Sequence, residues 1–175
     1  MEGLKERSSL VGGRNKAVVR RMIEGVWNDH DFTNFEEVVA ENHFDHMAAP
    51  EYQRGVAGER HVIEWLLTVF PDHRFDIEHA AGDGEMVAVR GTCRGTHEGE
   101  FWGIPPTGKR FAVQQSHWFR VVDGKVAKHW AGREVFRKIA QWSRESSIRV
   151  WEDEIDTFTG KYCSFSVWES KVEAR

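Results

Sequence analysis

The feature that most constrains this chain is a change in the spacing of its apolar residues at Pro71. Before Pro71 the apolar side chains recur at helical spacing, and after it they alternate with polar ones, as in half-buried strands. Helices followed by strands favour an α+β domain. The sequence therefore predicts a curved antiparallel sheet with the N-terminal helices packed over one side.

Three helices are expected before Pro71. The first spans residues 15–27, the second opens at a capping-box pattern and ends near residue 40, and the third spans about 58–70. The first helix carries an apolar stripe made of Val18, Val19, Met22, Ile23, Val26 and Trp27. Residues 1–14 are polar and Gly-rich, so we expect a flexible arm there.

Four strands are expected after Pro71, over residues 75–79, 86–96, 109–122 and 125–134. The last two are joined at Asp123-Gly124, a dipeptide typical of tight hairpins. Together with the helices, they make one domain over residues 15–136.

The C-terminal extension, residues 137–175, is harder to place. Residues 135–140 have the spacing of a short helix, and residues 162–168 alternate like a strand. Such a strand would pack on the domain's sheet edge or on a partner subunit.

Composition excludes several classes of protein. A chain of 175 residues can bury a core without a metal or disulfide, and Cys93 and Cys163 show no metal-binding or redox spacing. The net charge of -4 argues against nucleic-acid binding. No apolar run is long enough to span a membrane or to serve as a signal core. We expect a reduced, cytoplasmic protein.

Several separated motifs carry a family resemblance. They are Phe44-Asp45-His46, Phe70-Pro71-Asp72, the run GTHEGEFWGIPPTGK over residues 95–109, the run FRVVDGKV over residues 119–126, and His129-Trp130. In this order they resemble the SnoaL-like polyketide cyclase, or ester cyclase, family of the nuclear-transport-factor-2-like superfamily. The resemblance covers roughly residues 15–136.

The resemblance implies a cone-shaped fold whose concave side forms a deep apolar pocket. It implies cofactor-free chemistry on an aromatic polyketide or similar carbonyl compound, in which an acidic group removes a proton alpha to a carbonyl and an intramolecular aldol closure follows. Such chemistry needs a carboxylate or imidazole beside an apolar wall and a hydrogen-bond donor for the enolate oxygen. The resemblance also implies a homodimer formed through the outer face of the sheet.

The sequence departs from the family at one position. The resemblance implies a catalytic Asp directly after His129-Trp130, and this chain has Ala131 there, with Glu134 as the nearest carboxylate. Three hypotheses follow. The chain is a cyclase, isomerase or lyase, or it is a ligand-binding protein without chemistry, or it is an assembly subunit that makes contacts through its C-terminal extension.

The hairpin register decides which residues can act together. A two-residue turn at Asp123-Gly124 sets His117 opposite Trp130 and on one face with Glu134. A three-residue turn puts His117 on one face with His129, Ala131 and Arg133, and Glu134 then points away. A bulge farther along the strand would allow either arrangement.

His117 and Glu134 are the candidate catalytic pair, although a core histidine and a solvated strand-end charge are the simpler interpretations. The candidate substrate-binding residues are His46, Trp27, Trp65, Trp102, Trp130, His129 and Arg133. Arg90 and Arg94 suit ion pairs across the sheet better than a substrate carboxylate. We expect no metal, because His43 and His46 lack a third ligand at a recognised spacing.

Overall fold

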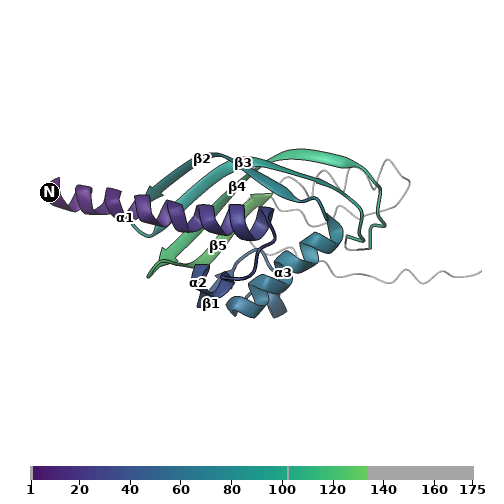
Figure 1. The fold of residues 1–175 in the computed structure, drawn as a ribbon, viewed down its shortest axis with the longest axis horizontal. Coiled ribbons are helices and arrows are strands. Elements are labelled where there is room, and N and C mark those ends of the chain that lie inside the picture. Colours follow the sequence, from purple (N-terminus) through teal and green to yellow (C-terminus); the bar gives the residue numbers. More distant parts are fainter. Residues whose placement is uncertain (1, 102, 134–175) are drawn as a thin grey trace, which may run out of the picture.

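Figure 1 presents the computed structural model of the chain, which describes residues 2–101 and 103–133. The helices are α1 (Glu2–Arg21), its π-helical continuation η1 (Met22–Asn28), α2 (Phe35–Val38), the single turn η2 (Pro50–Tyr52) and α3 (Gly55–Val69). The strands are β1 (Val39–Asp45), β2 (Arg74–Asp83), β3 (Met86–Thr96), β4 (Arg110–Val122) and β5 (Lys125–Arg133). The α+β class and the curved sheet predicted from the sequence are confirmed.

The strands form one sheet in the order β1-β5-β4-β3-β2. Strands β2 to β5 are an antiparallel meander, whereas β1 pairs with β5 in parallel, which the sequence did not predict. The second helix was expected to run to about residue 40, but it ends at Val38, where the chain enters β1. A strand paired with residues more than 80 positions away leaves little local signal, which is why this prediction was wrong at residues 39–45.

Helices α1 and α3 lie across the concave side of the sheet (Figure 1). The predicted apolar stripe faces the core, because Val19, Met22, Ile23, Val26 and Trp27 are buried and Val18 packs against them. Burial of such a stripe is the main source of stability for a helix of this kind.

The backbone of residues 2–14, where the sequence predicts a loose arm, is helical and continuous with the rest of α1. Around Gly12 and Asn15 this helix docks on the β2–β3 hairpin. Gly12 lies so close to the β2–β3 hairpin that a Cβ there would come within 2.6 Å of the Gly82 carbonyl oxygen. Asn15 Nδ2 also donates to the Gly84 carbonyl at 2.9 Å. Glycine weakens a helix by about 1 kcal/mol but here permits this close approach.

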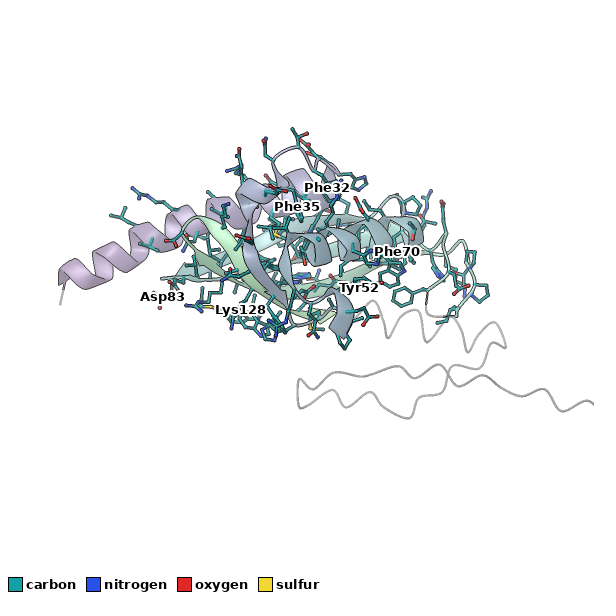
Figure 2. All side chains as sticks on the ribbon, turned by 90° about the horizontal axis from the view of Figure 1, so that it is seen from below. Phe32, Phe35, Tyr52, Phe70, Asp83 and Lys128 are labelled. Atoms are coloured by element: carbon teal, nitrogen blue, oxygen red, sulfur yellow. The ribbon has the colours of Figure 1, made fainter. Side chains whose placement is uncertain are left out.

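Asp72 ties the end of α3 to the sheet. Its carboxylate accepts hydrogen bonds from the Thr96 backbone N–H at 2.6 Å and the Thr96 hydroxyl at 2.7 Å. The loop after β3 then crosses the end of α3, where Val69 O accepts from the Glu98 and Gly99 N–H groups at 3.0 Å. Figure 2 shows Phe70 at this end of the molecule, with Asp83 near the opposite end beside α1.

The outer face of the sheet carries charged side chains and also two tryptophans, Trp118 and its register partner Trp130. Arg90 pairs with Glu78 at 2.9 Å and Arg94 with Asp76 at 2.8 Å, so the expected cross-sheet ion pairs are confirmed. Trp118 is 51% exposed on this face.

None of the helices in the described residues is both long and apolar enough to cross a bilayer. Several predictions fall outside the described residues: those for Trp102, Glu134 and Cys163, and for the extension over 137–175 with its expected helix and strand.

Candidate functional site

A cavity lies between the concave face of the sheet and the helices. Most of its wall is apolar. The wall comes from α3, from the residues that directly follow this helix, and from strands β2 to β4. Charged and hydrogen-bonding side chains also face it: Asp45, Glu59, His73, Gln115 and His117. An apolar cavity with a few converging polar groups is the usual form of a small-molecule site.

Four buried side chains form a chain of contacts along the cavity, and three of them, Gln115, His117 and Asp45, line its wall. His117 Nε2 is 3.0 Å from Gln115 Oε1, and His117 Nδ1 is 3.0 Å from His129 Nε2. His129 Nδ1 in turn lies 3.2 Å from Asp45 Oδ1, and all four residues are at most 6% exposed. The Met47 backbone N–H donates to Asp45 Oδ1 at 2.7 Å and orients the carboxylate.

The sheet register creates this chain. The turn at Asp123-Gly124 has two residues, both with positive φ, and Val122 faces Lys125. One residue farther, the pairing shifts from Val121↔Val126 to Arg120↔Lys128, so Ala127 is an extra residue in β5. The turn therefore has two residues, as in the first alternative predicted from the sequence. His117 nevertheless shares a face with His129, as in the second alternative.

As a result, His117 pairs with Ala131 and Phe119 with His129, which puts both imidazoles on the concave face. On the other side of β5, Asp45 of β1 is the register partner of His129. Three strands thus bring the acidic and basic groups together.

Two proton arrangements satisfy the contacts in this chain. In the first, His117 Nε2 donates to Gln115, His129 Nε2 donates to His117, and one further proton lies between His129 Nδ1 and Asp45. In the second, the Gln115 amide is turned so that its NH₂ donates to His117 Nε2, and every proton along the chain points toward an ionised Asp45. The second arrangement holds one proton fewer. Uptake of a proton at His117 Nε2 converts it into the first.

Trp27 forms the part of the cavity wall nearest to these groups. Its ring centroid is 5.1 Å from that of His117 and 5.7 Å from that of His129. It comes from η1, a π-helical segment of the type often found at functional sites. Its indole N–H is buried and has no hydrogen-bond partner among the described residues. It can therefore donate to a ligand oxygen.

A second buried acid–imidazole pair lies nearby. Glu59 Oε2 of α3 is 3.3 Å from His43 Nε2 of β1, and His43 Nδ1 is 3.0 Å from the Val126 carbonyl oxygen. Burial alone would lower the pKa of His43. The hydrogen bond and charge of Glu59, with the Val126 carbonyl and Asp45, outweigh it and raise that pKa above its ordinary value of 6.5.

One trio has the spacing of a metal site. Asp45, Glu59 and His129 each offer a ligand atom, and these atoms lie within 4.8 Å of one another. His129 already faces Asp45, and Glu59 already faces His43, so the four groups can balance their charges by sharing protons. The expectation of no metal remains a prediction.

The structure brings together three of the predicted site residues and separates others. Trp27 and His117 line the cavity, and His129 lies directly behind His117. Trp65 packs against the core beside Phe101 and does not line the cavity.

His46 stacks on Trp130 at 4.6 Å, and the alternation along β5 places Trp130 on the face opposite His117. Arg133 pairs through its backbone with Gln115. The predicted substrate contacts of these three residues, and the predicted roles of Trp102 and Glu134, remain predictions.

Sequence reasoning missed three functional candidates, Asp45, Gln115 and Glu59. Gln115 precedes His117 by two residues and therefore shares its face, which was a readable signal. Asp45 belonged to a quoted motif, but its strand was not recognised. Glu59 occupies the apolar side of α3, where a carboxylate is unusual, and this too was readable.

Comparison with known proteins identifies the family of this chain. The sequence model of the SnoaL-like polyketide cyclase family matches residues 17–141. Aklanonic acid methyl ester cyclase of Streptomyces peucetius is 30% identical over 119 residues, which cover 64% of this chain and 79% of that protein. Nogalonic acid methyl ester cyclase of Streptomyces nogalater is 32% identical over 69 residues, 39% of this chain and 52% of that protein.

Solved structures extend the likeness to the fold. IdmH of Streptomyces antibioticus is 27% identical with a TM-score of 0.62, covering 74% of this chain and 98% of IdmH. A SnoaL-like polyketide cyclase of Agrobacterium tumefaciens has a TM-score of 0.60 at 19% identity, covering 71% of this chain and 94% of that protein.

Proposed function

The chain belongs to the SnoaL-like polyketide cyclase family, and from this premise we propose that it is an enzyme that uses acid–base chemistry on an apolar carbonyl compound of the polyketide type. The observation that carries the proposal is the chain of contacts from His117, on the cavity wall, through His129 to the buried Asp45 carboxylate.

His117 is the proposed base. With Asp45 ionised and Gln115 donating to it, His117 Nε2 presents a lone pair on the cavity side. A substrate that displaces the Gln115 amide brings its alpha carbon to that nitrogen. The proton then enters at Nε2 while the His117 Nδ1 proton moves to His129, whose charge Asp45 stabilises. Positioned bases of this kind contribute about 10²- to 10⁴-fold to rates.

Trp27 is the proposed donor to the enolate oxygen. Its indole N–H is buried beside His117, and no residue in the described part of the chain accepts a hydrogen bond from it. A donor aimed at the developing negative charge in a water-poor cavity stabilises the transition state more than the ground state. The base and the donor thus occupy adjoining parts of one wall.

The substrate class rests on the cavity and on the relatives. Phe70, Phe75, Phe101 and Phe111 give the wall a large aromatic area that suits a flat, apolar ring system. Two similar proteins are named for methyl esters of polyketide acids. We propose a compound of this class, in which the enolate carbon attacks a ketone of the same molecule and closes a ring.

The test uses aklanonic acid methyl ester as the probe, in D₂O. NMR follows deuterium uptake alpha to the carbonyl, and chromatography follows ring closure. Wild type should catalyse both, and His117→Gln should lower both by about 10²-fold or more. His79→Gln, an exposed histidine of β2, is the matched control and should keep both rates. Equal rates for His117→Gln and wild type, with exchange above the buffer rate, would remove His117 from the mechanism.

Two further variants address Glu134, which follows β5 in the sequence, and Trp27 of η1. Glu134→Gln tests the other predicted catalytic residue, and a fall in turnover of about 10²-fold would make it the base. Trp27→Phe keeps the aromatic wall and removes the donor, so it should lower exchange with little change in ligand binding.

Ala131 favours a second candidate function, a binding protein without chemistry. It pairs with His117 at the position where the family resemblance implies a catalytic Asp. On this hypothesis wild type binds the ester but gives no exchange above the buffer rate. Ala131→Asp would then introduce weak exchange by supplying a carboxylate beside His117.

A further inference from the structure

Glu59 is a carboxylate in an unusual place. It lies on the cavity side of α3, next in the wall to Val62, Ile63 and Leu66, and is only 2% exposed. The other acidic residue of this helix, Glu64, is exposed and pairs with Arg60 at 2.7 Å. A buried carboxylate costs several kcal/mol unless a charge or a proton compensates it.

The compensation comes from His43, and its contacts determine the proton count. A carbonyl oxygen can only accept, so His43 Nδ1, 3.0 Å from Val126 O, carries a proton. His43 Nε2 faces Glu59 Oε2 at 3.3 Å, and two lone pairs cannot face each other favourably. One additional proton therefore belongs to the pair, either on His43 or on Glu59. The pair holds a transferable proton whose acidic end, Glu59, faces the cavity.

The two acid–imidazole pairs are also close to each other. Glu59 has a carboxylate oxygen within 4.8 Å of both Asp45 and His129. Asp45 is the far end of the chain that begins at His117. Two carboxylates this close and this buried interact strongly, so a proton gained by one pair makes the proton of the other easier to release.

We propose that Glu59 is the general acid of the reaction and that it shares the proton it donates with His43. This inference rests on the proposed function. As the enolate carbon forms its bond to the ketone carbon, the ketone oxygen gains the electron pair of its C=O bond and takes the proton from Glu59. His117 has meanwhile taken one proton from the alpha carbon. The substrate is isomerised with no net gain or loss of protons. A proton then passes from His117 by way of His129 and Asp45 to Glu59. This transfer restores the starting protonation of both groups.

The roles of the base, His117, and the acid, Glu59, can therefore be tested separately. Removal of the alpha proton needs His117 and the oxygen donor but not the proton of Glu59. Ring closure needs all three. A variant that lacks only the acid should still exchange deuterium and should fail to form product.

The experiment measures deuterium exchange and ring closure side by side, with the same methyl ester as the probe. Glu59→Gln should keep exchange within about threefold of wild type while ring closure falls by about 10²-fold or more. Glu59→Asp, which keeps a carboxyl group, should recover part of the ring closure. Glu64→Gln, on the exposed side of the same helix, is the matched control and should leave both rates unchanged. Circular dichroism and the melting temperature establish that each variant is folded.

Each failure has its own signature. Equal ring closure by folded Glu59→Gln and wild type would overturn the role of Glu59 and leave the proposed function intact. Parallel loss of exchange and ring closure in folded Glu59→Gln would also overturn it, because Glu59 would then act before the acid step. Absence of both activities in wild type would overturn the proposed function and this inference with it.

Discussion

His117 Nδ1 and His129 Nε2 lie 3.0 Å apart although the two residues are not register partners in the sheet. His117 pairs with Ala131, and His129 pairs with Phe119, so the contact runs diagonally between β4 and β5. The small side chain of Ala131 leaves room beside His117 for the imidazole of His129. The rings are nearly parallel, with 11° between their planes.

This relationship predicts energetic coupling along the chain. Asp45→Asn and His129→Gln should each lower the free energy of unfolding by about 1–3 kcal/mol, because each leaves a buried polar partner poorly satisfied. Since both changes break one network, the double variant should lose less than the sum, by about 0.5–3 kcal/mol. Urea unfolding measures the cycle. Additive losses would mean that the two contacts are independent.

The packing of α1 predicts opposite effects at two adjacent glycines. Gly12→Ala should destabilise the protein, because its Cβ would collide with the Gly82 carbonyl. No atom of the described residues lies within 4 Å of the Cβ position at Gly13, so Gly13→Ala should stabilise the helix by up to about 1 kcal/mol. Thermal unfolding compares the two variants. A gain for both would show that α1 does not dock on the hairpin through Gly12.

His43 predicts a loss of stability toward alkaline pH. Burial lowers the pKa of His43, but the hydrogen bond and negative charge of Glu59 raise it by more. The pKa therefore lies above 6.5. The folded protein therefore holds this proton more tightly than the unfolded chain. The resulting stabilisation is complete below about pH 6.5 and is lost as pH rises through the raised pKa. The stability difference between wild type and His43→Gln should therefore shrink from about pH 6 to about pH 9. A constant difference would contradict the raised pKa.

His97 predicts the opposite slope. Burial lowers its pKa below 6.5, despite a backbone bond to Gly99 that favours the charged form. The unfolded chain takes up this proton first, so stability is lost as pH falls below about 6.5. His97→Gln should lose less stability than wild type between about pH 7 and about pH 5. Exposed His61→Gln is the control and should follow wild type in the same titration.

Metal removal should leave the protein unchanged. The trio of Asp45, Glu59 and His129 is compensated by shared protons, so EDTA followed by dialysis should not alter the melting temperature. Elemental analysis of the purified protein checks the starting state. A fall in melting temperature that added zinc or manganese reverses would contradict the prediction.

The outer face of the sheet predicts a homodimer. Trp118, 51% exposed there, is a large apolar group of the kind that subunit contacts cover. Sedimentation should give about twice the chain mass of 20.2 kDa. Trp118→Glu should shift the equilibrium toward the monomer, whereas Leu10→Glu on exposed α1 should not. A wild-type monomer at micromolar concentration would contradict the prediction.

Local patterns in the sequence were enough to predict α3, the end of the first helix and strands β3 and β4, because each buries one face of regular period. They also placed His117 in an apolar strand, and the family resemblance implied that it faces the pocket. The motifs around Phe70-Pro71-Asp72 and residues 95–109 indicated the family, and Asp72 proves to anchor the backbone of Thr96.

Only the tertiary structure decided what His117 can do. One extra residue at Ala127 shifts β5 and exchanges its faces, so that His129 rather than Trp130 joins His117. The spacing of apolar residues does not reveal such a bulge, because the period on either side of it is the same. Asp45 and Glu59 reach the same place only through β1's parallel pairing with β5 and the docking of α3. These contacts join residues far apart in the chain, and their energies arise only when the whole core has assembled.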